Sequence, residues 1–159
     1  SRWEKKDLPL AKKLWLNRDV CEYLPQEGML TGEDILQWLF KEMEEEKKQH
    51  TQFWPVFEKD KGEFLGCCGL HAYDKNAIIY EVGFYLLPWY WDNGYGLEAG
   101  TKVLEYAGDR LNARKVVASC HPDNERAMGL LGKLEFRQTG DEFVEKAGVY
   151  FPFLEKSLR

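Results

Sequence analysis

Two glycines, Gly94 and Gly96, stand where the sequence changes from strand-like to helix-like. The preceding segment, Glu81 to Leu87, is apolar and aromatic enough for a strand, and Pro88 ends it because proline has no N–H to donate. An amphipathic helix is predicted next, with apolar or small residues every three or four positions at Leu97, Gly100, Leu104, Ala107 and Leu111. Since glycines let an anion reach the free N–H groups of a first helical turn, we predict a phosphate-bearing ligand here.

Two familiar phosphate motifs fit the Gly94-Tyr95-Gly96 segment poorly. A P-loop ends in Gly-Lys-Ser/Thr, whereas Gly132-Lys133-Leu134 lacks the hydroxyl that holds a metal ion. A dinucleotide fingerprint matches formally over Gly94 to Ala99, and the residues alone leave it open. However, residues 88–93 separate it from its strand, and the next strand ends in Ser119-Cys120 where an acidic residue should bind a ribose.

The surrounding pattern predicts the elements that position this turn. Helical periodicity dominates residues 1–50, with Asp7 and Thr31 as expected helix caps and Asn17 to Pro25 as a turn. Alternating residues then predict an antiparallel meander, and a strand–helix–strand crossover predicts a parallel pair. The expected strands are 53–58, 64–73, 77–87, 115–120, 136–139 and 149–154, with a loop at 140–148. The fold class is therefore α+β: a mixed, largely antiparallel sheet with helices on both faces.

Composition excludes several classes of protein. At 159 residues and 44 % hydrophobic composition, one domain with a sizeable core is expected. The net charge of −5 and the lack of a basic run argue against nucleic-acid or membrane-surface binding. No apolar run approaches the roughly 20 residues of a transmembrane helix. The cysteines form no C-x-x-C pair, and Cys67 and Cys68 should face opposite sides of a strand. We therefore expect buried thiols and no metal site. Free thiols also indicate a reducing compartment, so a cytoplasmic location is expected.

A resemblance to a known family rests on three segments. Glu81-Val82-Gly83-Phe84, Pro88 and Trp91-Asp92-Asn93-Gly94-Tyr95-Gly96-Leu97-Glu98-Ala99 together resemble the signature of the Gcn5-related N-acetyltransferases (GNAT), in particular the RimJ/RimL-like branch. His121-Pro122-Asp123-Asn124 through Lys133-Leu134-Glu135-Phe136 is similar to that branch's second signature, and Asn17 to Pro25 to its N-terminal helix exit. The resemblance implies one acetyltransferase domain over residues 1–159 with a splayed parallel strand pair. Because the sequence starts at Ser1 without Met, the domain's first strand can lie upstream.

The resemblance also implies acetyl-CoA as cosubstrate, without a metal. Its pantetheine arm would bind along Tyr85, Leu86 and Leu87, and its pyrophosphate on the amides of Trp91, Asp92, Asn93, Gly94, Tyr95, Gly96 and Leu97. Asn124, at a helix start, would contact the pantetheine or the acceptor as well as cap its helix. Asp92-Asn93 stands where the branch often has Gly-Lys, and Trp91 where the superfamily commonly has Gln or Arg. An acidic side chain beside a pyrophosphate is unfavourable, and Lys102, Arg126 and Lys133 are the cations that can compensate.

Acetyl transfer to an amine needs a base, and Glu81 is the first candidate because related acetyltransferases place a Glu at the matching position. His71 is the second candidate base, although a structural role suits it better, and His121 is expected to be solvated. The branch's usual Ser, a proton donor to the leaving thiolate, is replaced by Ala127; Tyr85, Tyr90 and Tyr95 are possible substitutes. Cys120 lacks a fixed base, so direct attack by the amine is favoured over an acyl-enzyme.

The acceptor is expected to be an amine-bearing small molecule or a protein N-terminus. The run Glu42 to Glu46 is either a solvated helix face or the rim of a site for a cationic acceptor, and Trp89 to Trp91 can line the acceptor mouth. A homodimer is compatible with these patterns, which do not fix the oligomeric state. The alternative function is a CoA-binding module of the same fold without catalysis, suggested by Ala127.

Overall fold

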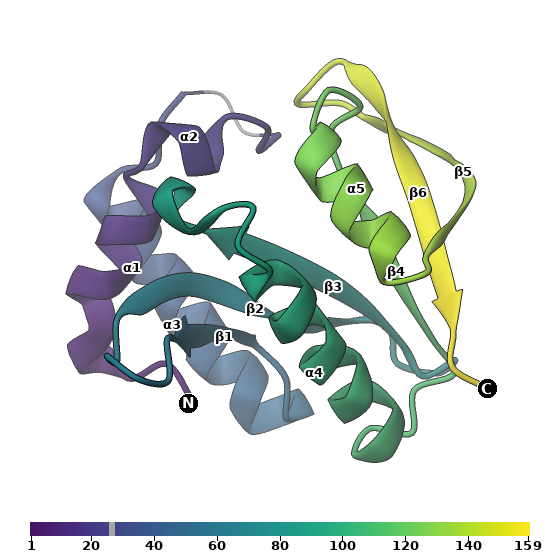
Figure 1. The fold of residues 1–159 in the computed structure, drawn as a ribbon, viewed down its shortest axis with the longest axis horizontal. Coiled ribbons are helices and arrows are strands. Elements are labelled where there is room, and N and C mark those ends of the chain that lie inside the picture. The colour runs from purple at the N-terminus through teal and green to yellow at the C-terminus, as the bar shows by residue number, and fades with distance from the viewer. Residues whose placement is uncertain (26–27) are drawn as a thin grey trace.

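The structure is a computed structural model that describes residues 1–25 and 28–159. Its elements in chain order are η1 (Lys5–Asp7), α1 (Leu8–Trp15), α2 (Arg18–Cys21), α3 (Gly32–Gln49), β1 (Phe53–Phe57), β2 (Phe64–Asp74), β3 (Ile79–Leu86), η2 (Pro88–Tyr90), α4 (Tyr95–Asp109), β4 (Lys115–Ser119), α5 (Glu125–Lys133), β5 (Arg137–Val144) and β6 (Val149–Ser157). Figure 1 shows their arrangement in space.

The strands form one mixed sheet in the order β1-β2-β3-β4-β6-β5. Neighbouring strands are antiparallel except β3 and β4, which are parallel. This parallel pair is short: Ile79–Glu81 pairs with Lys115–Val117, whereas β3 continues to Leu86 without further pairing to β4. The predicted α+β class with a splayed parallel pair is confirmed, and the splay leaves an opening between the two halves of the sheet.

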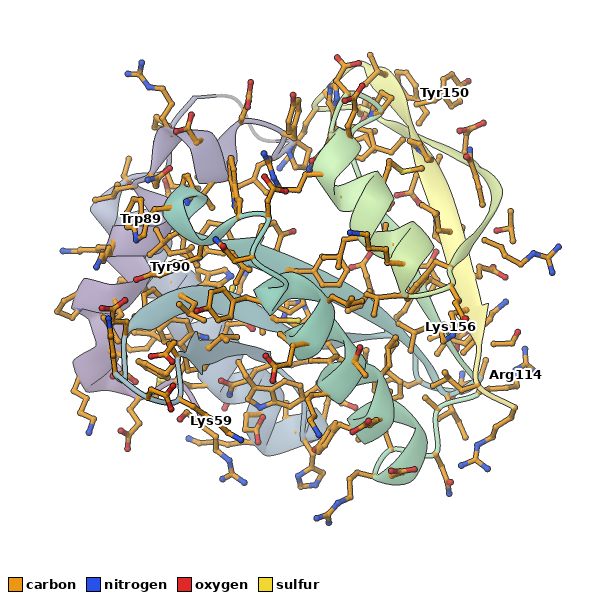
Figure 2. The ribbon with its side chains drawn as sticks, viewed as in Figure 1. Lys59, Trp89, Tyr90, Arg114, Tyr150 and Lys156 are labelled. Carbon is orange, nitrogen blue, oxygen red and sulfur yellow. The ribbon has the colours of Figure 1, made fainter. Side chains whose placement is uncertain are left out.

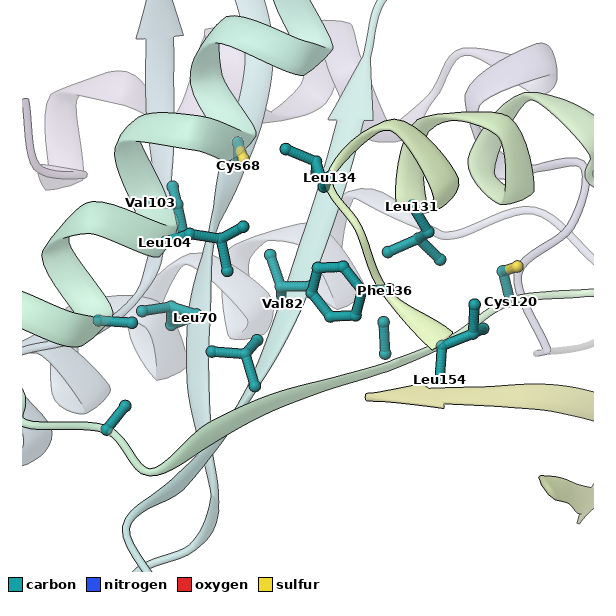
Figure 3. Close-up of a cluster of buried hydrophobic side chains, with 14 residues drawn as sticks. Cys68, Leu70, Val82, Val103, Leu104, Cys120, Leu131, Leu134, Phe136 and Leu154 are labelled. Carbon is teal, nitrogen blue, oxygen red and sulfur yellow. The ribbon is translucent and has the colours of Figure 1, made fainter. Parts of the chain in front are cut away.

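Helices cover both faces of the sheet, and each face has its own apolar core. On one face α4 and α5 pack over β2, β3 and β4 through a cluster that includes Leu70, Val82, Leu104 and Leu131 (Figure 3). On the other face α1 and α3 pack against β1 and β2, with Leu14, Ile35 and Leu39 fully buried. Figure 1 shows α4 and α5 in front of the sheet and α3 behind it.

The adjacent cysteines divide between the two cores. Cys68 belongs to the core under α4, and Cys67 to the core under α1 and α3, as the alternation of side chains along a strand predicts. Both are free and fully buried. Their burial raises the pKa of each thiol, that of Cys68 to about 12.

Local capping explains where the N-terminal helices begin. Thr31 caps α3 as predicted: its hydroxyl accepts the N–H of Asp34, whose carboxylate accepts the N–H of Thr31. Asp7 stands at the start of α1, but its carboxylate accepts the N–H of Glu4 instead of capping that helix. Asn17 accepts the N–H groups of residues 19 and 20, so the segment predicted as a turn contains the short helix α2.

The C-terminal hairpin differs from the sequence-based prediction. β5 extends to Val144, so a turn of residues 145–148 replaces the expected loop at 140–148. The missed part of the strand contains Gly140, Asp141 and Glu142, which are all exposed. Because neither side of this edge strand is buried there, the hydrophobic alternation that marks a strand is absent. In the part of the chain that the structure describes, no helix is long and apolar enough to cross a membrane.

Candidate active site

A cavity of about 630 Å³ occupies the opening between β3 and β4. Its walls come from β3, the loop after it, the first turn of α4, the length of α5, the end of β4, α2 and the segment after it, and the β5–β6 hairpin. Most of the predicted site residues line it, namely Glu81, Tyr85, Leu86, Trp91, Asp92, Gly94, Gly96, Leu97 and Asn124. The splay of the sheet therefore brings together the turn at Gly94 and the strand that carries Glu81.

The side of β3 that faces this cavity carries peptide groups without strand partners. The N–H of Leu87 donates to the carbonyl of Leu65 at 2.8 Å, so the odd-numbered residues of β3 exchange their hydrogen bonds with β2. The peptide groups of Phe84 and Leu86 consequently face the opposite side, beyond the point where pairing with β4 ends. Of these groups, the carbonyl of Leu86 accepts the indole N–H of Trp91 at 2.8 Å.

The loop between η2 and α4 presents a row of free backbone donors. The N–H of Trp91 donates to the carbonyl of Pro88, but among the described residues no acceptor bonds the N–H groups from Asp92 to Leu97. Asp92 and Gly94 hold left-handed conformations with φ of 61° and 82°. No side chain caps α4 at Gly94, so its positive dipole end opens into the cavity. Such an N-terminus favours an anion.

A cation compensates for the acidic residue in this loop. The guanidinium of Arg126 lies 3.6 Å from the centre of the Trp91 ring, and its Nε is 4.0 Å from the carboxylate of Asp92. Lys133 also lines the cavity. Lys102, the third cation considered from the sequence, pairs with Glu105 on the exposed side of α4. Arg126 thus places positive charge beside the loop that carries the free amides.

Three of the predicted cofactor residues lie outside the cavity lining. Leu87 is fully buried in the core beneath α1 and α3, and its N–H is already bonded to Leu65. The Asn93 side chain turns back to donate to the carbonyl of Trp91 at 3.0 Å. The Tyr95 ring packs edge-on against Tyr90. Only the backbone N–H groups of Asn93 and Tyr95 therefore remain for the predicted role, and Leu87 has no free N–H to offer.

Asn124 caps α5 at the cavity wall. Its Oδ1 accepts the N–H of Ala127 at 3.2 Å, which is the capping role predicted for it. The Nδ2 group of Asn124 has no acceptor among the residues that the structure describes. The Asn124 side chain thus combines a fixed orientation with a free donor, and both it and Ala127 line the cavity.

The other end of the cavity is built from side chains of distant segments. Glu81 is half-buried there, together with Glu142 of β5, Phe151 of β6, and Tyr23. Burial raises the pKa of Glu81; His71 lowers it and Glu142 raises it, with burial prevailing. Sequence reasoning missed Tyr23, Glu142 and Phe151, because nothing in their local pattern places them beside Glu81. Ser119, at the end of β4, also lines the cavity.

His121 is not solvated as the sequence suggested. Its side chain is 22 % exposed and lies between the rings of Tyr23 and Phe151, with centroids 5.2 and 5.4 Å away. Its Nδ1 accepts the N–H of Asp123 at 3.1 Å. The turn before α5 therefore fixes His121 as part of the cavity wall, and the contacts from Tyr23 and Phe151 account for its burial.

The acidic run on α3 is neither a uniformly solvated face nor a rim of this cavity. Glu42 is 2 % exposed, accepts the backbone N–H of Phe53, and lies 2.7 Å from Nε2 of His71. Glu45 accepts the N–H of Ala72 and the hydroxyl of Thr51. Both proposed interpretations of the run are wrong for Glu42, because its carboxylate is directed into the sheet.

The remaining candidates divide between the cavity and the surface. Tyr90 lines the cavity, but its hydroxyl donates to Glu63. Trp89 is exposed beside Lys13, outside the cavity lining (Figure 2). Tyr85 lines the cavity, and its burial raises the pKa of its hydroxyl. Burial also raises the pKa of the Cys120 thiol to about 11, so it is protonated near neutral pH and a poor nucleophile.

Comparisons with known proteins agree with this architecture. Residues 1–137 match the model of the acetyltransferase (GNAT) domain. The uncharacterized N-acetyltransferase YnaD of Bacillus subtilis (strain 168) is 28 % identical over 138 residues, covering 87 % of this chain and 78 % of YnaD. Two solved structures share the fold with TM-scores of 0.82 and cover 99 % of this chain. The ribosomal-protein-S5-alanine acetyltransferase from Vibrio fischeri is 19 % identical, and the match covers 91 % of that chain. The spermidine N-acetyltransferase from Vibrio cholerae, in complex with CoA and spermine, is 16 % identical, and the match covers 93 % of that chain.

These matches confirm the superfamily that the glycine turn and its flanking segments resemble. At identities below 25 %, the two solved structures support the fold, including its likeness to ribosomal-protein acetyltransferases, and not the acceptor. The domain match over most of the sequence is what decides the family: this chain belongs to the GNAT acetyltransferases and is an N-acetyltransferase.

Proposed function

We propose that the protein transfers the acetyl group of acetyl-CoA to a primary amine by direct attack of that amine. The observation that carries the proposal is the pairing of the open edge of β3 with the row of free amides from Asp92 to Leu97, both facing one cavity. An extended pantetheine arm needs the first feature, and a pyrophosphate needs the second. Family membership supports the same cosubstrate.

In this proposal the chain binds the cosubstrate mainly through its backbone. The peptide groups of Phe84 and Leu86 hydrogen-bond the pantetheine as an added strand would. The N–H groups at the start of α4 hold the pyrophosphate, and Arg126 contributes the cation. Asn124 lines the same space. Its free Nδ2 donates to the pantetheine in this proposal.

The reaction then needs a proton acceptor near the thioester, and Glu81 is positioned for it. An ammonium with a pKa near ~10 is protonated at neutral pH, so it must lose a proton before attack. Glu81, directly or through water, takes this proton. The neutral amine nitrogen then bonds to the acetyl carbon, the C–S bond breaks, and the second proton that the nitrogen loses passes through water to the leaving thiolate. A backbone N–H of β3 near Leu86 stabilises the developing oxyanion. Ala127 supplies no hydroxyl for the thiolate, so the proposal assigns no side-chain acid.

The end of the cavity at Glu81, Glu142 and Phe151, here called the acceptor end, favours a cationic amine. Glu81 and Glu142 both line it, and the described residues contain no Lys or Arg paired with either carboxylate. The ring of Phe151 forms an apolar wall there, against which the aliphatic part of an amine can pack. Structural relatives act on spermidine and on an alanine of a ribosomal protein, as their names state, so both amine types belong in a screen.

The test combines binding and turnover. Isothermal titration should show one acetyl-CoA site per chain, and a thiol-release assay with spermidine and an alanine-initiated peptide should give turnover with at least one of them. Mass spectrometry of the amine should show one added acetyl group. Binding without turnover on any amine of a broad panel favours the rival function, a CoA-binding module without catalysis. Absence of binding contradicts the site itself.

A further inference from the structure

The buried carboxylate Glu42 lies far from the cofactor turn, yet it is linked to the proposed base. It belongs to α3 and reaches the sheet between β1 and β2. Its Oε1 and Oε2 are 3.0 and 2.7 Å from Nε2 of His71, and it also accepts the N–H of Phe53. Because a carboxylate only accepts hydrogen bonds, Nε2 of His71 carries the proton in this contact. The contact therefore fixes both the ring orientation and the tautomer of His71.

A second contact fixes the plane of the same ring. The imidazole of His71 stacks on the ring of Phe53, with a centroid distance of 3.8 Å and an interplanar angle of 6°. The Phe53 ring in turn lies over Gly83, where an added Cβ would come within 2.7 Å of it. Phe53 is thus held between His71 and the backbone of β3, and His71 has little freedom to rotate.

His71 and Glu81 are directly opposite one another on neighbouring strands. They are Cα partners in the β2–β3 register, and the alternation set by Leu87 makes them a hydrogen-bonded pair. Side chains of such a pair lie on the same face with Cβ atoms roughly 5.5 Å apart. The imidazole consequently lies beside Glu81 on the same face of the sheet, where a positive charge on it acts on the carboxylate.

We propose that Glu42 and His71 are positioning residues for Glu81, a role that rests on the proposed function of Glu81 as the base. Glu42 holds the imidazole of His71 in place with its Nε2 protonated, and His71 orients the Glu81 carboxylate and keeps it ionised toward the acceptor end of the cavity. The arrangement extends from helix α3 through β2 to β3, so a helix outside the cavity supports its chemistry.

The electrostatics agree with this geometry. Burial lowers the pKa of His71, but the hydrogen bond and charge of Glu42, with the charges of Glu45 and Glu81, outweigh burial and raise it. Burial raises the pKa of Glu81 and so disfavours its ionised form, His71 lowers that pKa, and Glu142 raises it. His71 is therefore the neighbour that favours the carboxylate form required of a base.

Nuclear magnetic resonance titration tests the proposal without any acceptor amine. The imidazole Hε1 signal of His71, assigned with His71→Gln, is followed against pH in the wild type, Glu81→Gln, Glu42→Gln and the control Glu44→Gln. Glu44 is an exposed carboxylate on the same helix. We expect the His71 midpoint to fall by about 0.5 to 1 pH unit in Glu81→Gln, to fall further in Glu42→Gln, and to stay unchanged in Glu44→Gln.

Glu81→Gln changes a half-buried residue of the cavity wall. Its titration therefore still tests the proposal if Glu42→Gln fails to fold. An unchanged His71 midpoint in Glu81→Gln means that the two groups do not interact, and it overturns the proposal. Because the two titrations are linked, the midpoint of the Glu81 carboxyl titration should rise in His71→Gln by about as much as the His71 midpoint falls in Glu81→Gln.

Kinetics then separate this inference from the proposed function. With the best amine from the acceptor screen, the acidic limb of the kcat/KM profile should move to higher pH in Glu42→Gln, with the rate recovering at high pH. A uniform loss at every pH indicates a merely structural role and contradicts positioning. A wild-type rate in Glu81→Gln instead removes the base from the proposed function, whatever the titrations show.

Discussion

The two ends of the cavity are made from different parts of the chain. The end at α4 consists mostly of backbone: the N–H groups from Asp92 to Leu97 and the open edge of β3. The end at the β5–β6 hairpin consists mostly of side chains, including Glu81, Glu142, His121 and Tyr23. Under the proposed function, the backbone surface binds the part that every CoA thioester has in common, whereas the side chains at the other end can be exchanged to suit an acceptor.

The same contrast appears in how each end is supported. The α4 end depends on local conformation, with left-handed Asp92 and Gly94 turning the chain into the helix. The acceptor end depends on contacts between segments far apart in sequence, such as Glu42 with His71 and Tyr23 with His121. Substitutions at the two ends should therefore separate cosubstrate binding from the chemical step.

The largest effect is expected from Glu81→Gln. The amide cannot take a proton from the amine, so kcat should fall by 10²-fold or more at pH 7, since general bases contribute about 10²–10⁴-fold. The dissociation constant for acetyl-CoA should stay within about two-fold, because Glu81 belongs to the acceptor end. Steady-state kinetics and calorimetry measure the two quantities, with Glu44→Gln as control. If acetyl-CoA binding weakened as much as the rate fell, Glu81 would also serve cosubstrate binding, and the assignment of separate roles to the two ends of the cavity would be wrong.

The opposite result is expected from Gly94→Val. A β-branched residue is strained at φ of 82°, so the loop that holds the free amides should change its conformation, and acetyl-CoA should bind at least ten-fold more weakly. Gly108→Val, near the other end of α4 and also in open space, is the matched control. Calorimetry at a temperature where circular dichroism shows both variants folded gives the comparison. An unchanged affinity in Gly94→Val contradicts the assignment of the amides.

The two ends of the cavity also differ in how well the sequence could predict them. The strand, turn and helix around Gly94 follow from local periodicity and from glycine and proline placement, so the predicted motif and the α+β class were confirmed. The strand that contains Glu142 was predicted too short, because its exposed residues after Thr139 lack a periodic signal. Glu42 was misinterpreted because its partner His71 is 29 residues away, and composition cannot separate a solvated acidic run from one that sends a carboxylate inward.

A smaller and opposite effect is expected from Asp92→Asn. This change removes a negative charge beside the free amides while keeping a residue type that tolerates φ of 61°. Acetyl-CoA should bind about two- to five-fold more tightly at low salt, and the gain should shrink as ionic strength rises. Calorimetry at two salt concentrations measures this. Weaker binding would mean that Asp92 serves the cosubstrate through its carboxylate, which would sharpen the backbone account into one that includes a side chain.

The smallest effect is expected from Cys120→Ala. The thiol is buried and its raised pKa keeps it protonated near neutral pH, so direct attack does not require it. The turnover rate should remain within about two-fold of the wild type, and intact-protein mass spectrometry should detect no acetylated enzyme when the amine is withheld. A large loss of rate together with an acetyl adduct on Cys120 would replace direct attack with a covalent intermediate.

The most direct measurement of the central claim is a crystal structure of the protein grown with coenzyme A. The account predicts the pyrophosphate on the N–H groups between Asp92 and Leu97, within reach of Arg126, and the pantetheine along Val82 to Leu86 with its thiol directed toward Glu81. Coenzyme A bound elsewhere, or a cavity that stays closed to it at saturating concentration, would contradict the claim.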